Sequence, residues 1–122
     1  MRKKDKEDLS AWIRSAIEDF VASPENSLQN KNNEAAWEKP LVGFSQGDDP
    51  LYEEIKKLIG PFYWDPADVF KAAFPDTEAT AHELTVIAWI LPQTRATRME
   101  SRKETHYPSE RWARSRKFGE EF

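Results

Sequence analysis

The chain has 122 residues, of which 39% are hydrophobic and 33% charged, and its formal net charge is −4 at pH 7. Its mean hydropathy of −0.81 is more polar than that of an average globular domain, whereas 12% aromatic residues argue against general disorder. No apolar run reaches the roughly 18 residues that a membrane span needs, and no secretory apolar segment follows the basic start. We therefore expect a cytoplasmic protein that does not enter a membrane.

Cysteine is absent from the sequence, and histidine occurs only twice. The lack of cysteine excludes disulfides, a thiol nucleophile and a cysteine-ligated metal cluster from these residues. Two histidines are too few to close a zinc site. We therefore expect no metal ligands within the chain.

Residues 1–23 have the pattern of an amphipathic helix that packs on a core. Apolar residues recur at intervals of three and four, namely Leu9, Trp12, Ile13, Ala16, Ile17, Phe20 and Val21. Pro24 should end this helix, because proline disfavours helix at the residue before it. Residues 24–39 are rich in asparagine and long for a connection within a compact domain, which predicts a mobile polar linker.

Residues 40–122 carry the signals of a mixed domain. Leu41–Phe44 is a short extended segment, and two Asp-Pro pairs, at Asp49 and Asp65, each predict a helix with an aspartate cap and proline in the first turn. Leu84–Leu91 is almost wholly apolar, which is typical of a strand covered on both faces. The sequence thus predicts a helix-rich α+β chain with one or two short strands.

Such a strand needs neighbours that this inventory of elements does not supply. Either the chain assembles with a copy of itself, or it is the front portion of a longer protein, and we favour the second interpretation. Phe122, a large apolar residue after a last helix that begins at Ser109 and has no clear stop, agrees with truncation.

The segment after the strand is strongly basic. From Arg95 to Lys117 there are eight lysines and arginines against three glutamates. Residues 93–107 show no periodicity and are predicted to form a long loop, and loops of this length often bind ligands or cover sites. Arginine suits phosphate or carboxylate recognition because its guanidinium group offers a planar fork of donors. The alternative is a solvated loop whose charges pair internally with Glu100 and Glu104.

No catalytic signature accompanies this basic segment. Paired carboxylates that would act as acid and base are not evident, and the four glycines fit no phosphate-binding fingerprint. We therefore expect no catalytic residue in this chain.

Several runs of residues resemble the amino-terminal part of the epoxyqueuosine-reductase-like iron–sulfur proteins. The similar runs are Pro40–Phe44, Val86–Thr94, Arg102–Glu104, Tyr107–Arg114 and Phe118–Phe122. The resemblance implies a cytoplasmic oxidoreductase whose nitroreductase-like α/β region binds cobalamin and whose later module holds two four-iron four-sulfur clusters on cysteines. Those cysteines are missing here, so residues 40–122 would be a truncated first part of the cobalamin region, inactive alone and completed by the remainder of the parent chain.

The resemblance places the basic segment near the corrinoid or substrate cleft. The candidate cofactor- or substrate-binding residues are Arg95, Arg98, Arg102, Tyr107 and Arg111. A second hypothesis is a stand-alone interaction module whose basic loop 93–107 binds an anionic partner such as RNA, tRNA included, and which completes its sheet by self-association.

Overall fold

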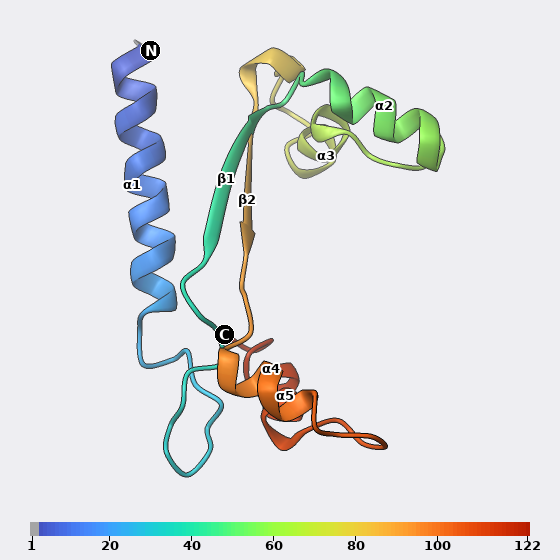
Figure 1. Ribbon diagram of the computed structural model, residues 1–122. Coiled ribbons are helices and arrows are strands. Elements are labelled where there is room, and N and C mark those ends of the chain that lie inside the picture. Colours follow the sequence, from blue (N-terminus) through green and yellow to red (C-terminus); the bar gives the residue numbers. More distant parts are fainter. Residues whose placement is uncertain (1–2) are drawn as a thin grey trace. The chain divides into compact units, whose positions relative to one another are not determined.

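The computed structural model describes residues 3–122 and shows an α+β chain (Figure 1). The elements in chain order are α1 (Lys3–Val21), β1 (Leu41–Gln46), α2 (Pro50–Ile59), α3 (Pro66–Ala73), the 3₁₀ helix η1 (Ala81–Glu83), β2 (Thr85–Ile90), α4 (Arg95–Ser101) and α5 (Glu110–Phe118). Within these residues, five α-helices and one two-stranded sheet confirm the predicted α+β class.

The sheet pairs β1 with β2 in antiparallel orientation. The amide of Gly47 donates to the carbonyl of Leu84 at one end, and the amide of Glu38 donates to the carbonyl of Pro92 at the other, both over 2.8 Å. Residue numbers therefore rise along one strand as they fall along the other. An antiparallel bridge between Trp37 and Gln93 extends the pairing beyond β2.

The two Asp-Pro pairs begin helices, as the sequence predicts. Asp49 accepts a hydrogen bond from the amide of Leu51. Asp65 accepts one from the amide of Asp68, whose carboxylate accepts one from the amide of Asp65 in return, which completes a capping box. These bonds satisfy amides that lack a partner in the first helical turn.

The chain forms two compact units. One unit joins the chain up to Val42 to Trp89–Phe122, and the other is Gly43–Ala88. The first helix and the expected linker therefore belong to the same unit as the carboxy-terminal residues.

Residues 24–39 form a hydrogen-bonded loop around Asn26. The side-chain amide of Asn26 donates to the carbonyls of Val21 and Trp37, and its oxygen accepts from the amides of Ala36 and Trp37. Leu28 and Ala36 are fully buried in the same loop. The polar composition that predicted a linker thus includes the side chain that organises this loop.

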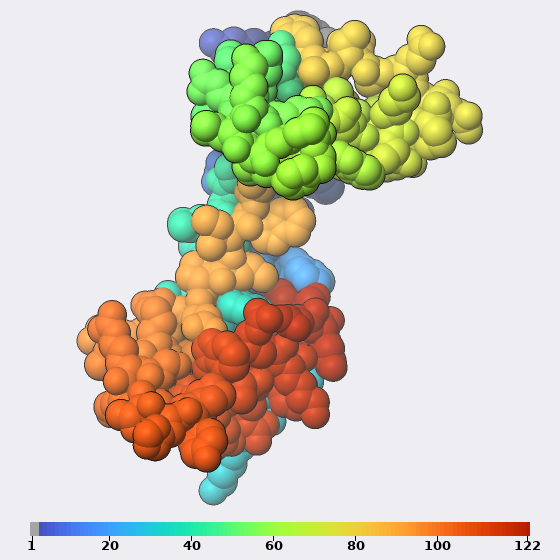
Figure 2. Space-filling model, turned by 90° about the vertical axis from the view of Figure 1, so that its right-hand side faces the viewer, coloured from blue at the N-terminus to red at the C-terminus, as the bar shows by residue number. Residues whose placement is uncertain are grey.

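The apolar strand forms, as the sequence predicts. The prediction that both of its faces are covered is wrong for the described residues. Trp89 is 56% exposed and Ile90 is 63% exposed, and only Val86 along β2 is partly shielded. Figure 2 shows side chains of this segment, in light orange, at the surface. The helices α2 and α3 likewise keep no buried residue, and Leu58 on α2 is 87% exposed. Much of the apolar surface therefore lacks cover within the described residues.

Candidate functional site

The predicted loop 93–107 contains a helix, α4, and this corrects the sequence interpretation. Thr94 caps the helix, because its hydroxyl accepts a hydrogen bond from the amide of Thr97, which is fully buried. Arg98 also reaches back from the helix to the carbonyl of Gln93. The helix has no apolar stripe, and for this reason its sequence lacks the periodicity that reveals helices.

α4 brings three of the candidate arginines onto one side. Arg95, Arg98 and Arg102 are spaced by three and four residues, a spacing that places side chains on the same helical face. Glu38 lies at the start of this face, where it accepts a bond of 2.7 Å from the amide of Arg95 and its carboxylate lies 3.6 Å from the guanidinium of Arg98. We call Arg95, Arg98 and Arg102 the arginine face.

Two members of the arginine face have unpaired guanidinium groups. The side chains of Arg95 and Arg102 are exposed, and within residues 3–122 neither makes a hydrogen bond or an ion pair. An external anion can reach both groups without displacing an internal carboxylate.

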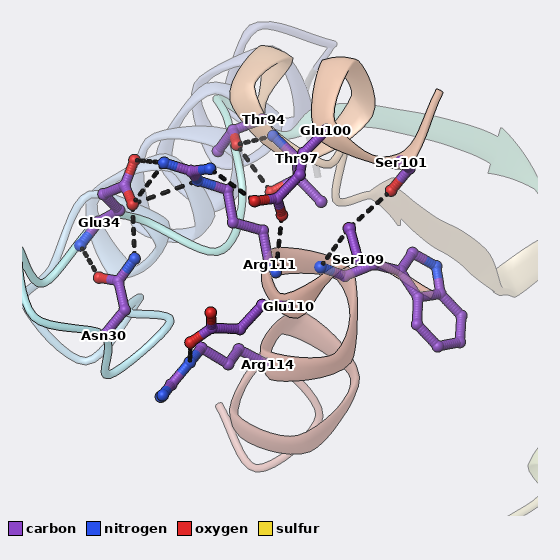
Figure 3. Close-up of polar contacts among 11 residues, drawn as sticks. Asn30, Glu34, Thr94, Thr97, Glu100, Ser101, Ser109, Glu110, Arg111 and Arg114 are labelled. Atoms are coloured by element: carbon purple, nitrogen blue, oxygen red, sulfur yellow. Dashed lines mark hydrogen bonds and ion pairs between the residues drawn. The ribbon is translucent and has the colours of Figure 1, made fainter. Parts of the chain in front are cut away.

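Arg111 is engaged differently, as Figure 3 shows. Its guanidinium group binds Glu34 through two donors, over 3.2 and 3.3 Å, and Glu100 through a third, over 3.0 Å. Its backbone amide also donates to the other oxygen of Glu100. Two carboxylates therefore already occupy the fork of this candidate ligand-binding residue, so we assign it to the internal network.

The charges of this network shift the ionisation of its members. Hydrogen bonds from Arg111 and then from Asn30 hold the pKa of Glu34 below its ordinary value, because they stabilise the charged carboxylate. Glu34, with a smaller contribution from Glu100, raises the pKa of Arg111. Glu34 and Arg111 are therefore both charged at neutral pH, and the network ties the loop 24–39 to α4 and α5.

Further polar contacts fix α5 beside α4. Ser109 caps α5 by accepting from the amide of Trp112, and its hydroxyl lies 3.0 Å from that of Ser101 at the end of α4. Arg114 pairs with Glu110 one turn earlier and donates to the carbonyl of Gln29. These contacts account for a second basic side chain of the segment (Figure 3).

The last candidate, Tyr107, is 81% exposed and makes no contact that assigns it a role. The structure thus brings Arg95, Arg98 and Arg102 together, leaves Tyr107 at the surface and places Arg111 in an internal network. Sequence reasoning missed Glu34, which lies 77 residues before Arg111 and gives no local signal of the pairing.

The described residues contain neither a metal-binding cluster nor a helix long and apolar enough to cross a membrane. The chain was also compared with protein families, curated proteins and solved structures. No family model, no curated protein and no solved structure matches it.

Proposed function

We propose that the chain supplies the amino-terminal α+β part of a cytoplasmic corrinoid-dependent iron–sulfur reductase that resembles epoxyqueuosine reductase. In this role it is not catalytic alone, and the remainder of the parent chain carries the electron-transfer groups. The similar runs Val86–Thr94 and Tyr107–Arg114 support the proposal, and one of them includes the apolar strand.

One structural observation carries the proposal further than the resemblance. β2 has the composition of a fully buried strand, yet Trp89 and Ile90 are more than half exposed. Burial of such side chains is worth roughly 1.5–3 kcal/mol each, so an uncovered strand is costly. The nitroreductase-like region of the longer parent protein would supply this cover.

The residues that bind the cofactors of the longer protein would lie partly in this chain and partly in the remainder of the protein. The two clusters require cysteine ligands, which this chain lacks, so their ligands would lie elsewhere in the parent. The resemblance places the basic segment near the corrinoid or substrate cleft, and Arg95 and Arg102 offer unpaired guanidinium groups that suit an anionic contact there. A bound corrinoid would supply the redox chemistry, and the arginine face would hold an anionic group of the cofactor or substrate.

The test is to purify, without oxygen, the protein encoded by the full open reading frame and to record its absorption spectrum. We expect bands of iron–sulfur clusters and of a corrinoid, and none from the 122-residue chain. The double variant Arg95→Gln/Arg102→Gln should lower corrinoid content, while Arg116→Gln, whose partner Glu120 lies on the next turn, should not. A reading frame without a downstream cysteine-rich region would contradict the proposal.

A second function is favoured by the arginine face itself. A helix that presents three arginines, two of them unpaired, suits the phosphates of RNA, including tRNA. Binding of this kind should weaken steeply with salt, because each neutralised phosphate releases counterions. The measurement is the tRNA affinity of the 122-residue chain at several salt concentrations. It compares the unsubstituted chain with the double variant Arg95→Gln/Arg102→Gln and with Arg116→Gln. If the affinity changes neither with salt concentration nor in the double variant, RNA binding through the arginine face is contradicted.

A further inference from the structure

β2 has an open edge as well as uncovered faces. Within residues 3–122 it pairs with β1 alone, so the backbone groups of its other edge have no strand partner. A two-stranded sheet is marginally stable in water, and a third strand adds backbone hydrogen bonds as well as apolar contacts.

The open edge of β2 lacks the features that usually protect edge strands. Natural edges carry charged residues or proline, which discourage pairing with another chain. Thr85–Ile90 contains no charged residue and no proline, and it is rich in β-branched and aromatic residues. β1 is less open, because Arg14 donates to the carbonyl of Val42 over 2.7 Å and Gly43 weakens the strand.

The charges that flank β2 indicate what kind of strand would pair there. Glu83 lies two residues before the strand, and Arg95, whose guanidinium group is unpaired, follows the strand. In an antiparallel pair the start of one strand lies beside the end of the other. Two copies of β2 paired in this way would bring Glu83 of each copy toward Arg95 of the other, at both ends of the pair.

We propose that a second copy of this chain pairs antiparallel with the open edge of β2 and forms a four-stranded sheet across a two-fold axis. The interface is self-complementary, as such symmetry requires, in its strand direction and in the charges at its ends. This inference concerns the 122-residue chain by itself and does not rest on the proposed function.

The absence of cysteine permits a direct test by disulfide cross-linking. The two-fold axis places one residue near the strand centre opposite its own copy, where directly opposite Cα atoms are roughly 4.5–5.5 Å apart. This separation suits a disulfide. The variants Ile87→Cys and Ala88→Cys cover both alternatives, and we expect one of them to form a dimer on mild oxidation.

Gly43→Cys on β1 is the matched control, because a Cβ atom at Gly43 meets nothing within 4 Å. In the proposed sheet the two copies of β1 are three strand spacings apart, roughly 14 Å, which is too far for a disulfide. Cross-linking through Gly43→Cys, with none through Ile87→Cys or Ala88→Cys, would assign the interface to β1 and overturn the proposal.

Sedimentation velocity tests the same interface without cross-links. We expect the unsubstituted 122-residue chain to sediment as a dimer of two 14.2 kDa chains. Ala88 is exposed, so changes there spare the interior. Ala88→Lys should weaken dimerisation about two- to fivefold relative to Ala88→Gln, because like charges near the axis repel. If the unsubstituted 122-residue chain stays monomeric at all concentrations, the proposal is refuted.

The same variants made in the full-length protein separate this inference from the proposed function. A cross-link in the 122-residue chain that disappears in a longer, cofactor-containing protein would support both, because the parent would then cover β2 itself. A cross-link in the short chain together with a reading frame that lacks cluster cysteines would support the dimer and contradict the reductase.

Discussion

Asn26 is the residue on which the loop 24–39 depends most. Its side chain makes four hydrogen bonds to backbone groups, and it is 93% shielded from solvent by a loop with few apolar residues. An asparagine amide offers two donors and two acceptor lone pairs, and here both kinds are used. A side chain of this kind fixes a loop that apolar packing alone would leave loose.

Replacement of Asn26 should therefore destabilise the unit that contains it. Asn26→Ala leaves backbone groups of Val21, Ala36 and Trp37 without partners, and we expect a loss of about 2–4 kcal/mol in the free energy of unfolding. Chemical denaturation monitored by circular dichroism measures this loss. Asn32→Ala, at an exposed position of the same loop, is the control and should change stability little. Equal effects of the two variants would contradict the role of Asn26.

Glu34 predicts how stability depends on acid. Its pKa is lowered in the folded chain, so its contribution to stability is present above its ordinary value of 4.5 and is lost as the pH falls through the lowered value. Glu34→Gln should be less stable than the unsubstituted chain at neutral pH, and this difference in stability should shrink below pH 4.5. Thermal unfolding across this range tests it, with Glu104→Gln as the control. A difference that is independent of pH would contradict a role for the charge.

At the scale of elements, sequence predicted what local chemistry determines. Asp65 and Pro66 begin α3 by contacts within one turn, so their pattern was sufficient. α4 was missed because it has no apolar stripe, so its only local signal is the Thr94 cap, and because Glu38, which accepts from the amide of Arg95, lies 57 residues earlier in the chain. The run Leu84–Leu91 predicted a strand correctly, but periodicity contains no information on what covers it.

The pair of α2 and α3 supplies a prediction about how elements are held together. Lys56 on α2 binds Asp68 on α3 over 2.8 Å, and this contact raises the pKa of Lys56 and lowers that of Asp68. Lys56→Gln should lower the thermal midpoint at neutral pH. The pKa of Asp68 is lowered and that of Lys56 is raised. The difference in thermal midpoint between Lys56→Gln and the unsubstituted chain should therefore decrease in acid, where Asp68 is protonated, and in strong alkali, where Lys56 loses its proton.

Lys57→Gln is the control for that experiment. Lys57 pairs with Glu53 on the same helix, and both side chains are highly exposed, so its removal breaks no contact between helices. If Lys57→Gln lowers the midpoint as much as Lys56→Gln, the contact between α2 and α3 is not what stabilises this unit.

At the scale of the molecule, the described residues bury few large apolar side chains, and the tryptophans report this directly. Trp12, Trp64, Trp89 and Trp112 are 67%, 59%, 56% and 38% exposed. Trp37 alone is better shielded; it packs on Gly119 and donates to its carbonyl. Most of the intrinsic fluorescence should therefore come from indole rings that solvent reaches.

Iodide quenching of the 122-residue chain tests this distribution of tryptophans. We expect most of the emission to be quenched, with a resistant fraction that disappears in Trp37→Phe. Pairing through β2 would add Trp89 to the resistant fraction, so Trp89→Phe should then reduce that fraction in the dimer and leave it unchanged after dilution to monomer. In the longer protein that we propose, cover of β2 by the additional residues would protect Trp89 at every concentration. Resistance of all five tryptophans in the short chain would mean that its apolar surface is buried in a way that this fold does not provide.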